Sequence, residues 1–166
     1  MKLLPGLLAM SLFASLASAQ TDPTTPPAGA KALLMLTGVG VQIYTCKDTP
    51  AGPAWAFVAP QAKLLDEHGV DAGTHGAGPV WTLKDGSSVK GQLLTNKPSP
   101  DAGSIPWLLL KAVETKGPGA LAAVAYIRRS ETEGGKARAT GCDATHIGAT
   151  DKVDYKATYT FYGAGQ

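Results

Sequence analysis

Short apolar runs separated by turn-forming residues fill this sequence after about residue 30. Turn signals rich in glycine, proline, asparagine or aspartate recur every ten to fifteen residues, with no long amphipathic helical pattern between them. In the run "DYKATYTFYG", Tyr155, Ala157, Tyr159 and Phe161 recur at every second position, which places them on one face of a strand. The pattern predicts an all-β fold of about eight or nine short strands, arranged as an antiparallel β-sandwich or barrel.

Two further stretches indicate where strands bend or turn. "VQIYTC" (41–46) alternates between two faces, whereas the preceding "GVG" (38–40) predicts a bend or bulge. Asp85-Gly86 is a pair favoured at two-residue type I′ turns, because both central residues of that turn need positive φ. We therefore expect a hairpin with strands at 80–84 and 87–93.

The first 19 residues have the pattern of a secretory signal peptide. Lys2 precedes the apolar core "LLPGLLAMSLFASL", and the small residues of "ASA" (17–19) mark a cleavage site between Ala19 and Gln20. The apolar core is shorter than the roughly 20 residues of a membrane-spanning helix, so no transmembrane anchor is expected. These features predict an extracytoplasmic protein, either periplasmic or secreted.

The remaining chain divides by composition into two parts. The proline-rich stretch "QTDPTTPPAGA" (20–30) has no apolar periodicity and predicts a disordered lead, and residues 31–166 are expected to form a single β domain. The formal charge of the whole chain is +2, and its basic residues are scattered apart from "RR" at 128–129. A nucleic-acid partner is therefore not expected. The composition does not specify an oligomeric state.

Cys46 and Cys142 are the two cysteines of the chain. In an oxidising compartment the simplest interpretation of such a pair is one disulfide, since no Cys-x-x-Cys or cysteine–histidine spacing supports a metal or redox site. The bridge would close a loop of 96 positions.

The stretch "HGVDAGTHGAGPVWTLKDGSSVKG" (68–91) is the strongest candidate for a binding site. Small residues around His75 and Gly78 would let a ligand approach the backbone, and Trp81 and Trp107 offer large apolar surfaces with one polar group each. Such residues suit a small molecule, a glycan or a component of the cell envelope. Their alternative role is structural, as a glycine-rich corner that leads into a hairpin and as aromatic core packing.

A metal site is the competing hypothesis. His68, His75 and His146 are the three histidines, and imidazoles bind zinc or copper in extracytoplasmic proteins. Their spacing matches no established ligand pattern. Neither G-x-S-x-G nor H-E-x-x-H occurs, so no catalytic residue can be named from motifs. No cofactor is expected unless this metal hypothesis holds.

Five blocks in order resemble one known family: "GVGVQIYTC", "AGTHGAGPVWTLKDGSSVKG", "IPWLLLKA", "VAYIRRSETEGG" and "YKATYTFYG". The chain is similar to the family named domain of unknown function 3455 over nearly all of residues 33–163. The resemblance implies an exported single-domain protein. It implies no mechanism, and no catalytic residue is carried over from it.

Together these features favour a non-enzymatic, exported binding or envelope-associated module. The alternative is a metal-binding protein or metal-dependent enzyme centred on His75.

Overall fold

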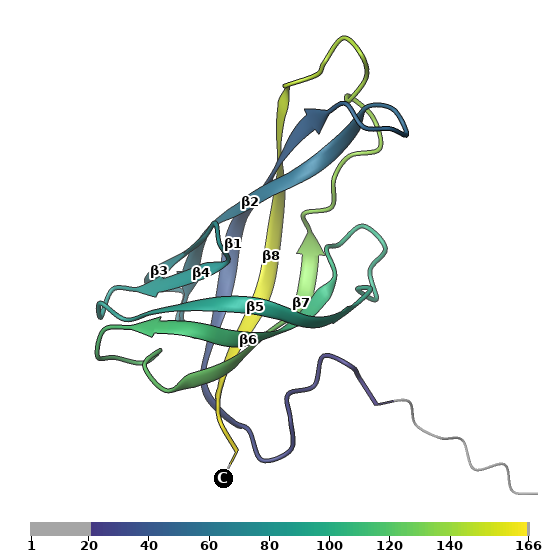
Figure 1. The fold of residues 1–166 in the computed structure, drawn as a ribbon. Coiled ribbons are helices and arrows are strands. Elements are labelled where there is room, and N and C mark those ends of the chain that lie inside the picture. The colour runs from purple at the N-terminus through teal and green to yellow at the C-terminus, as the bar shows by residue number, and fades with distance from the viewer. Residues whose placement is uncertain (1–20, 166) are drawn as a thin grey trace, which may run out of the picture.

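A computed structural model describes residues 21–165, and the predicted signal peptide and its cleavage site lie outside them. One antiparallel sheet of eight strands runs in sequence order, and β8 pairs with β1 to close it into a barrel (Figure 1). The prediction of an all-β fold is confirmed. The strands are β1 (Lys31–Lys47), β2 (Ala54–Leu65), β3 (Asp71–Gly76), β4 (Val80–Leu83), β5 (Ser88–Lys97), β6 (Trp107–Lys116), β7 (Val124–Gly134) and β8 (Thr150–Gly163). Residues 21–165 include no helix that is long and apolar enough to cross a membrane.

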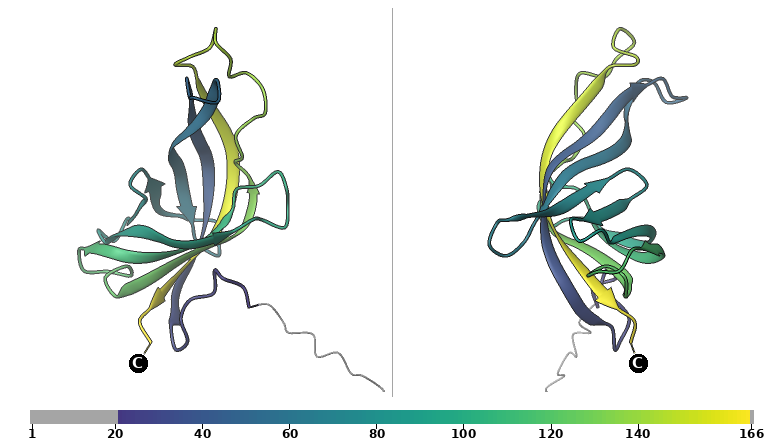
Figure 2. Two further views of the ribbon diagram at one scale, coloured as in Figure 1. Left: turned by 45° about the vertical axis from the view of Figure 1, so that its right-hand side comes forward. Right: turned by 90° about the vertical axis from the view of Figure 1, so that its left-hand side faces the viewer.

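The barrel wall is uneven because β3 and β4 are short. They have 6 and 4 residues, whereas their neighbours β2 and β5 have 12 and 10. β3 pairs with 62–65 of β2, and β4 pairs with 88–90 of β5. Beyond these ranges β2 and β5 diverge without a strand between them (Figure 2).

β2 is one continuous strand although it contains a proline. It passes through Pro60, which pairs with Gln42 of β1. The side of β2 that faces β3 is unpaired at this point, so the missing N–H of proline breaks no ladder there. A turn at 66–69 follows the strand, and in it Gly69 N–H donates to Asp66 O.

The hairpin predicted at Asp85-Gly86 is present, but its turn type differs. Gly86 has φ +85°, whereas Asp85 does not have positive φ, so the turn is not type I′. Leu83 and Ser87 hydrogen-bond across a three-residue loop, and Gly86 N–H donates to Leu83 O. This is a type I turn followed by a left-handed glycine, the usual form of three-residue hairpin loops.

The core lies between the inner faces of the strands. Tyr155, Ala157, Tyr159 and Phe161 of β8 are all buried, as the alternation predicted. The bulge that was one of the two alternatives predicted at 38–40 is absent, because β1 keeps its register with β2 and β8 there. Gly38 is needed for close packing instead: a Cβ at this position would lie 2.5 Å from Cε2 of Tyr159.

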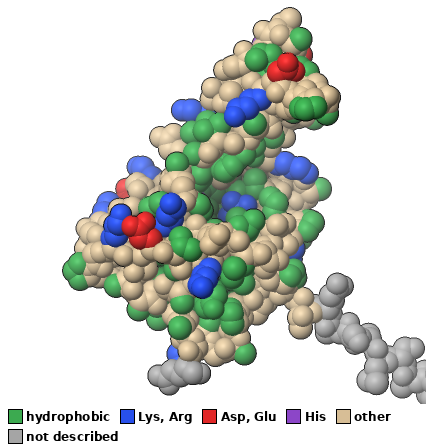
Figure 3. Space-filling model, in the orientation of Figure 1, with side chains coloured by type: hydrophobic (Ala, Val, Ile, Leu, Met, Phe, Trp, Pro, Cys, Tyr) green, Lys and Arg blue, Asp and Glu red, His purple; other side chains and the backbone are tan. Residues whose placement is uncertain are grey.

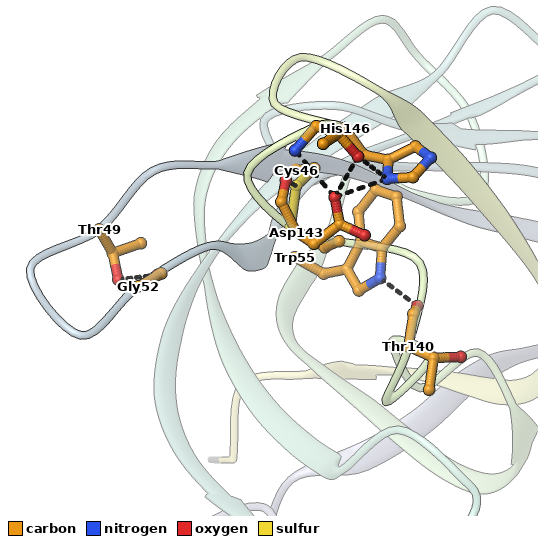
Figure 4. The surroundings of a disulfide bond; sticks show 9 residues. Cys46, Thr49, Gly52, Trp55, Thr140, Asp143 and His146 are labelled. Carbon is orange, nitrogen blue, oxygen red and sulfur yellow. Dashed lines mark hydrogen bonds and ion pairs between the residues drawn. A yellow bond between two sulfur atoms is a disulfide. The ribbon is translucent and has the colours of Figure 1, made fainter.

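β1, β2 and β8 extend beyond the rest of the barrel and form an arm, residues 44–57 and 136–152 (Figures 1 and 2). Cys46 and Cys142 are joined by a disulfide within it, with Cα atoms 5.3 Å apart (Figure 4). Trp55 adds a second tie, because its indole N–H donates to Thr140 O at 3.0 Å. The loop before β8 is thus fastened to the ends of β1 and β2.

Residues 21–30, for which the composition predicted a disordered lead, contact the outer face of the barrel. Asp22 accepts hydrogen bonds from Lys97 at 2.7 Å and from Arg128 at 2.8 Å. Both cations also lie over the Trp107 ring, 4.2 and 5.3 Å from its centroid. Thr24 beside them is fully buried. The contacts join this segment to β5 and β7.

Candidate ligand-binding cavity

A cavity of about 720 Å³ lies inside the barrel and opens through the gap between β2 and β5. Figure 3 shows it as a hollow beneath the arm, lined by apolar side chains with basic ones at its centre. All eight strands contribute to its lining, which consists of Gln42, Phe57, Val58, Pro60, His75, Gly78, Pro79, Trp81, Lys90, Gly91, Gln92, Leu93, Leu108, Leu110, Val113, Arg129 and Tyr159.

The entrance of the cavity is apolar. Four large apolar side chains line it, and each of them is 50–56% exposed. We call these four residues the rim: Phe57, Val58, Leu93 and Val113. Large apolar side chains exposed next to one another lose favourable burial energy, so such groups mark surfaces that contact a ligand or partner.

His75 and Trp81 form the inner wall. They lie directly opposite each other in the β3–β4 pair, and their rings stack with centroids 4.3 Å apart and planes 6° apart. Tyr159 packs edge-on against both rings, 5.0 and 5.5 Å away. Gly78, with φ +107°, makes the turn that closes this hairpin and lines the cavity beside it.

The His75 imidazole is neutral at pH 7. Burial lowers its pKa to about 4, against the opposing effect of its hydrogen bond to Val80 O, and the nearby Arg129 charge lowers it further. The ring nitrogen Nδ1 lies 2.9 Å from Val80 O, so it carries the proton and donates. The other nitrogen, Nε2, is then a hydrogen-bond acceptor.

Arg129 brings a positive charge to the cavity. It lies on the same face of β7 as the buried Ile127, because residues two apart on a strand share a face. Its Nε and Nη2 donate to Pro106 O at 3.0 and 2.8 Å. No carboxylate of residues 21–165 forms an ion pair with it, and the lining contains no aspartate or glutamate.

Two buried donors of the lining have no acceptor within residues 21–165. They are Nε2 of Gln42 and Nε1 of Trp81, and both residues are 1% exposed. A buried N–H without a partner costs roughly 1–3 kcal/mol. An oxygen atom of a bound molecule could accept hydrogen bonds from these two N–H groups and remove this cost.

The family model described as "Protein of unknown function (DUF3455)" matches residues 27–163. The chain belongs to the DUF3455 family. Neither the curated proteins nor the solved structures include a match to this chain. The matched range covers every strand of the barrel.

The structure brings three of the four predicted binding residues of this DUF3455 domain together. His75, Gly78 and Trp81 line one cavity, whereas Trp107 lies on the outer face between Lys97 and Arg128 and does not reach it. The glycine-rich segment 68–91 therefore forms the β3–β4 hairpin and also part of the cavity wall.

The three histidines are not assembled in the DUF3455 domain. His68 lies exposed in the turn after β2 beside Glu67, and His146 lies in the arm, 2.8 Å from Asp143 (Figure 4). Within residues 21–165 no three histidine, cysteine or acidic side chains are placed to hold a metal ion. The residues present do not fit the zinc or copper hypothesis.

Sequence reasoning missed Gln42 and Arg129. One signal for Arg129 was available: Ile127 is an apolar strand residue expected to face inward, and Arg129 follows it by two positions. Gln42 gave a similar signal in the alternating run 41–46, where it shares a face with Tyr44 and Cys46. A charged or amide side chain on an inner face is a candidate site residue because burial of an unpaired polar group is unfavourable.

Proposed function

We propose that this DUF3455 domain is a non-enzymatic binding module that holds a small, largely apolar molecule inside its barrel. The observation that carries the proposal is the cavity of about 720 Å³ to which every strand contributes. Its volume falls within the range of about 300–1,000 Å³ that is typical of small-molecule sites.

The lining favours an apolar molecule over a glycan. Sugars bind through flat stacking on an exposed aromatic face, but Trp81 is 1% exposed, with one face covered by His75. The rim is instead formed by aliphatic side chains and one phenyl ring. Contact with an apolar ligand would remove this surface from water, at roughly 25 cal/mol per Å².

We further propose that the protein works outside the cytoplasm. The signal-peptide pattern of residues 1–19 supports this location. The disulfide between Cys46 and Cys142 is compatible with it, because such bonds persist in oxidising compartments.

The proposal is tested by titration with N-phenyl-1-naphthylamine, an uncharged apolar dye that fluoresces when it leaves water. We expect saturable binding of one dye per chain. Val58→Glu, which places a charge on the rim, should weaken binding at least tenfold. Val70→Glu is the matched control, since Val70 is equally apolar and 60% exposed but does not line the cavity.

Dye binding that is absent, or that is weakened equally by Val58→Glu and Val70→Glu, would reject the cavity as the binding site. Melting temperatures of both variants within a few degrees of the wild type show that the comparison is made between folded proteins.

A further inference from the structure

We infer that the cavity takes an amphiphile with an anionic head, which enters head first so that its acidic group meets Arg129 and its apolar body lies along the rim. This inference rests on the proposed function and names the class of ligand for the same site.

The polarity of the cavity changes from its entrance to its interior. The rim is apolar and half exposed, whereas the polar lining residues Gln42, His75 and Tyr159 are almost fully buried. A ligand that is polar at one end and apolar at the other matches this gradient in one orientation. The polar end must lie inside, because an inserted apolar end would leave the buried donors of Gln42 and Trp81 without an acceptor.

The charge of the interior selects the sign of the head group. Arg129 is half-buried; it donates to the neutral Pro106 carbonyl, and its side chain also acts on the neutral Tyr159 hydroxyl. Lys90 adds a second cation to the lining, but it is exposed and lies opposite Glu114 in the β5–β6 pair, so Arg129 is the cation of the lining that forms no ion pair with a carboxylate of residues 21–165. A guanidinium held at the wall of a low-dielectric cavity attracts an anion much more strongly than it would in water.

The neighbours of Arg129 do not oppose an anion. Burial keeps His75 and Tyr159 neutral. The Arg129 charge lowers the pKa values of both side chains, so its electrostatic effect extends into the cavity. Trp81 and Gln42 offer N–H donors. A carboxylate is an acceptor of hydrogen bonds and can accept from a guanidinium with two oxygens, so it suits this set of donors.

The test compares three ligands with the same ten-carbon chain: decanoate, decanol and decylammonium. Each is titrated at pH 7.5 against the bound dye, below its micelle concentration. We expect decanoate to bind at least tenfold more tightly than decanol, and decylammonium to bind more weakly than decanol. Because the chain is constant, the differences report the head group.

The wild type and three variants test whether Arg129 is the residue that binds the head group. Arg129→Gln should lower decanoate affinity about tenfold or more and leave decanol affinity within twofold. Arg129→Lys keeps the positive charge and should keep the preference for decanoate. Lys111→Gln removes the same charge from an exposed position outside the cavity and should match the wild type.

Equal binding of decanoate and decanol to the wild type would overturn the inference, and this comparison does not depend on any variant being stable. A preference for decanoate that persists in folded Arg129→Gln would also overturn it. In both cases decanol and the dye still bind, so the proposed function stands. If neither the dye nor decanol binds, the proposed function itself fails.

Discussion

His75 is 4% exposed and its ring is stacked on Trp81, so the imidazolium form has almost no water to solvate it. This burial lowers the pKa of His75 to about 4, far below the value of about 6.5 for an exposed histidine. Between these two values the unfolded chain binds a proton at this residue that the folded protein does not bind. The contribution of His75 to stability is therefore complete above pH 6.5 and decreases as the pH falls towards 4.

The stability of the protein should therefore depend on pH. The free energy of unfolding should be lower at pH 5 than at pH 7 by about 2 kcal/mol, measured by urea denaturation. His75→Phe, which keeps an aromatic ring against Trp81 but cannot be protonated, should lose most of this difference. His68→Gln is the control: His68 lies exposed in a turn, and the variant should behave as the wild type. A wild type equally stable at both pH values would contradict the assignment.

Gly38 serves the packing between two strands of this protein. Gly38 lies in the middle of β1, where the ring of Tyr159 from β8 occupies the space that a Cβ would fill. A glycine in a strand lacks the packing of a side chain, but here it allows two strands to share one buried ring. The ring of Tyr159 in turn lines the cavity, so the packing of β1 against β8 fixes part of the site.

Gly38→Val should therefore destabilise the protein, although valine is a better strand former than glycine. We expect a loss of about 2 kcal/mol in the free energy of unfolding, since the added side chain must displace the buried Tyr159 ring. Gly76→Val is the matched control in β3, because a Cβ at Gly76 meets no atom within 4 Å and neither glycine has positive φ. Equal effects of the two substitutions would show that strand propensity, and not packing, decides stability here.

The whole molecule combines a closed barrel with an arm that projects from it. The end of β1 pairs with the start of β2 on one side and with the start of β8 on the other, and the disulfide joins the arm across 96 positions of sequence. Phe57 and Val58 of the rim belong to β2, and Phe57 is the last residue of its part of the arm. The arm is thus a structural wall of the cavity entrance as well as an extension of the sheet.

Removal of the disulfide should lower stability substantially. Cys142→Ser is expected to reduce the free energy of unfolding by about 4 kcal/mol, because the bridge limits the freedom of a long loop in the unfolded chain. Urea denaturation measures the loss, and thiol titration should find one free sulfur, that of Cys46. Cys46→Ser should give the same loss. An unchanged midpoint with no free thiol would contradict the pairing.

Strand positions and faces could be predicted from the sequence because alternation is a local property of the chain. The buried face of β8 and the hairpin at Asp85-Gly86 follow from residues next to one another. Details that depend on distant contacts were not predictable in this way. The sequence around Gly38 predicted a bend or bulge, for example, but it could not predict the packing role of this glycine, because the Tyr159 ring lies more than a hundred residues away in the chain.

The sequence by itself determined an all-β chain, one pair of cysteines and a histidine–tryptophan segment near a hairpin. Only the tertiary structure decided that β3 and β4 are too short to fill the wall between β2 and β5, and that a cavity opens there. It also separated two adjacent arginines, with Arg128 held outside by Asp22 and Arg129 turned into the barrel. The reason is physical: the period of a strand assigns side chains to two faces, but closure of the ring decides which face is inside and which inner residues meet.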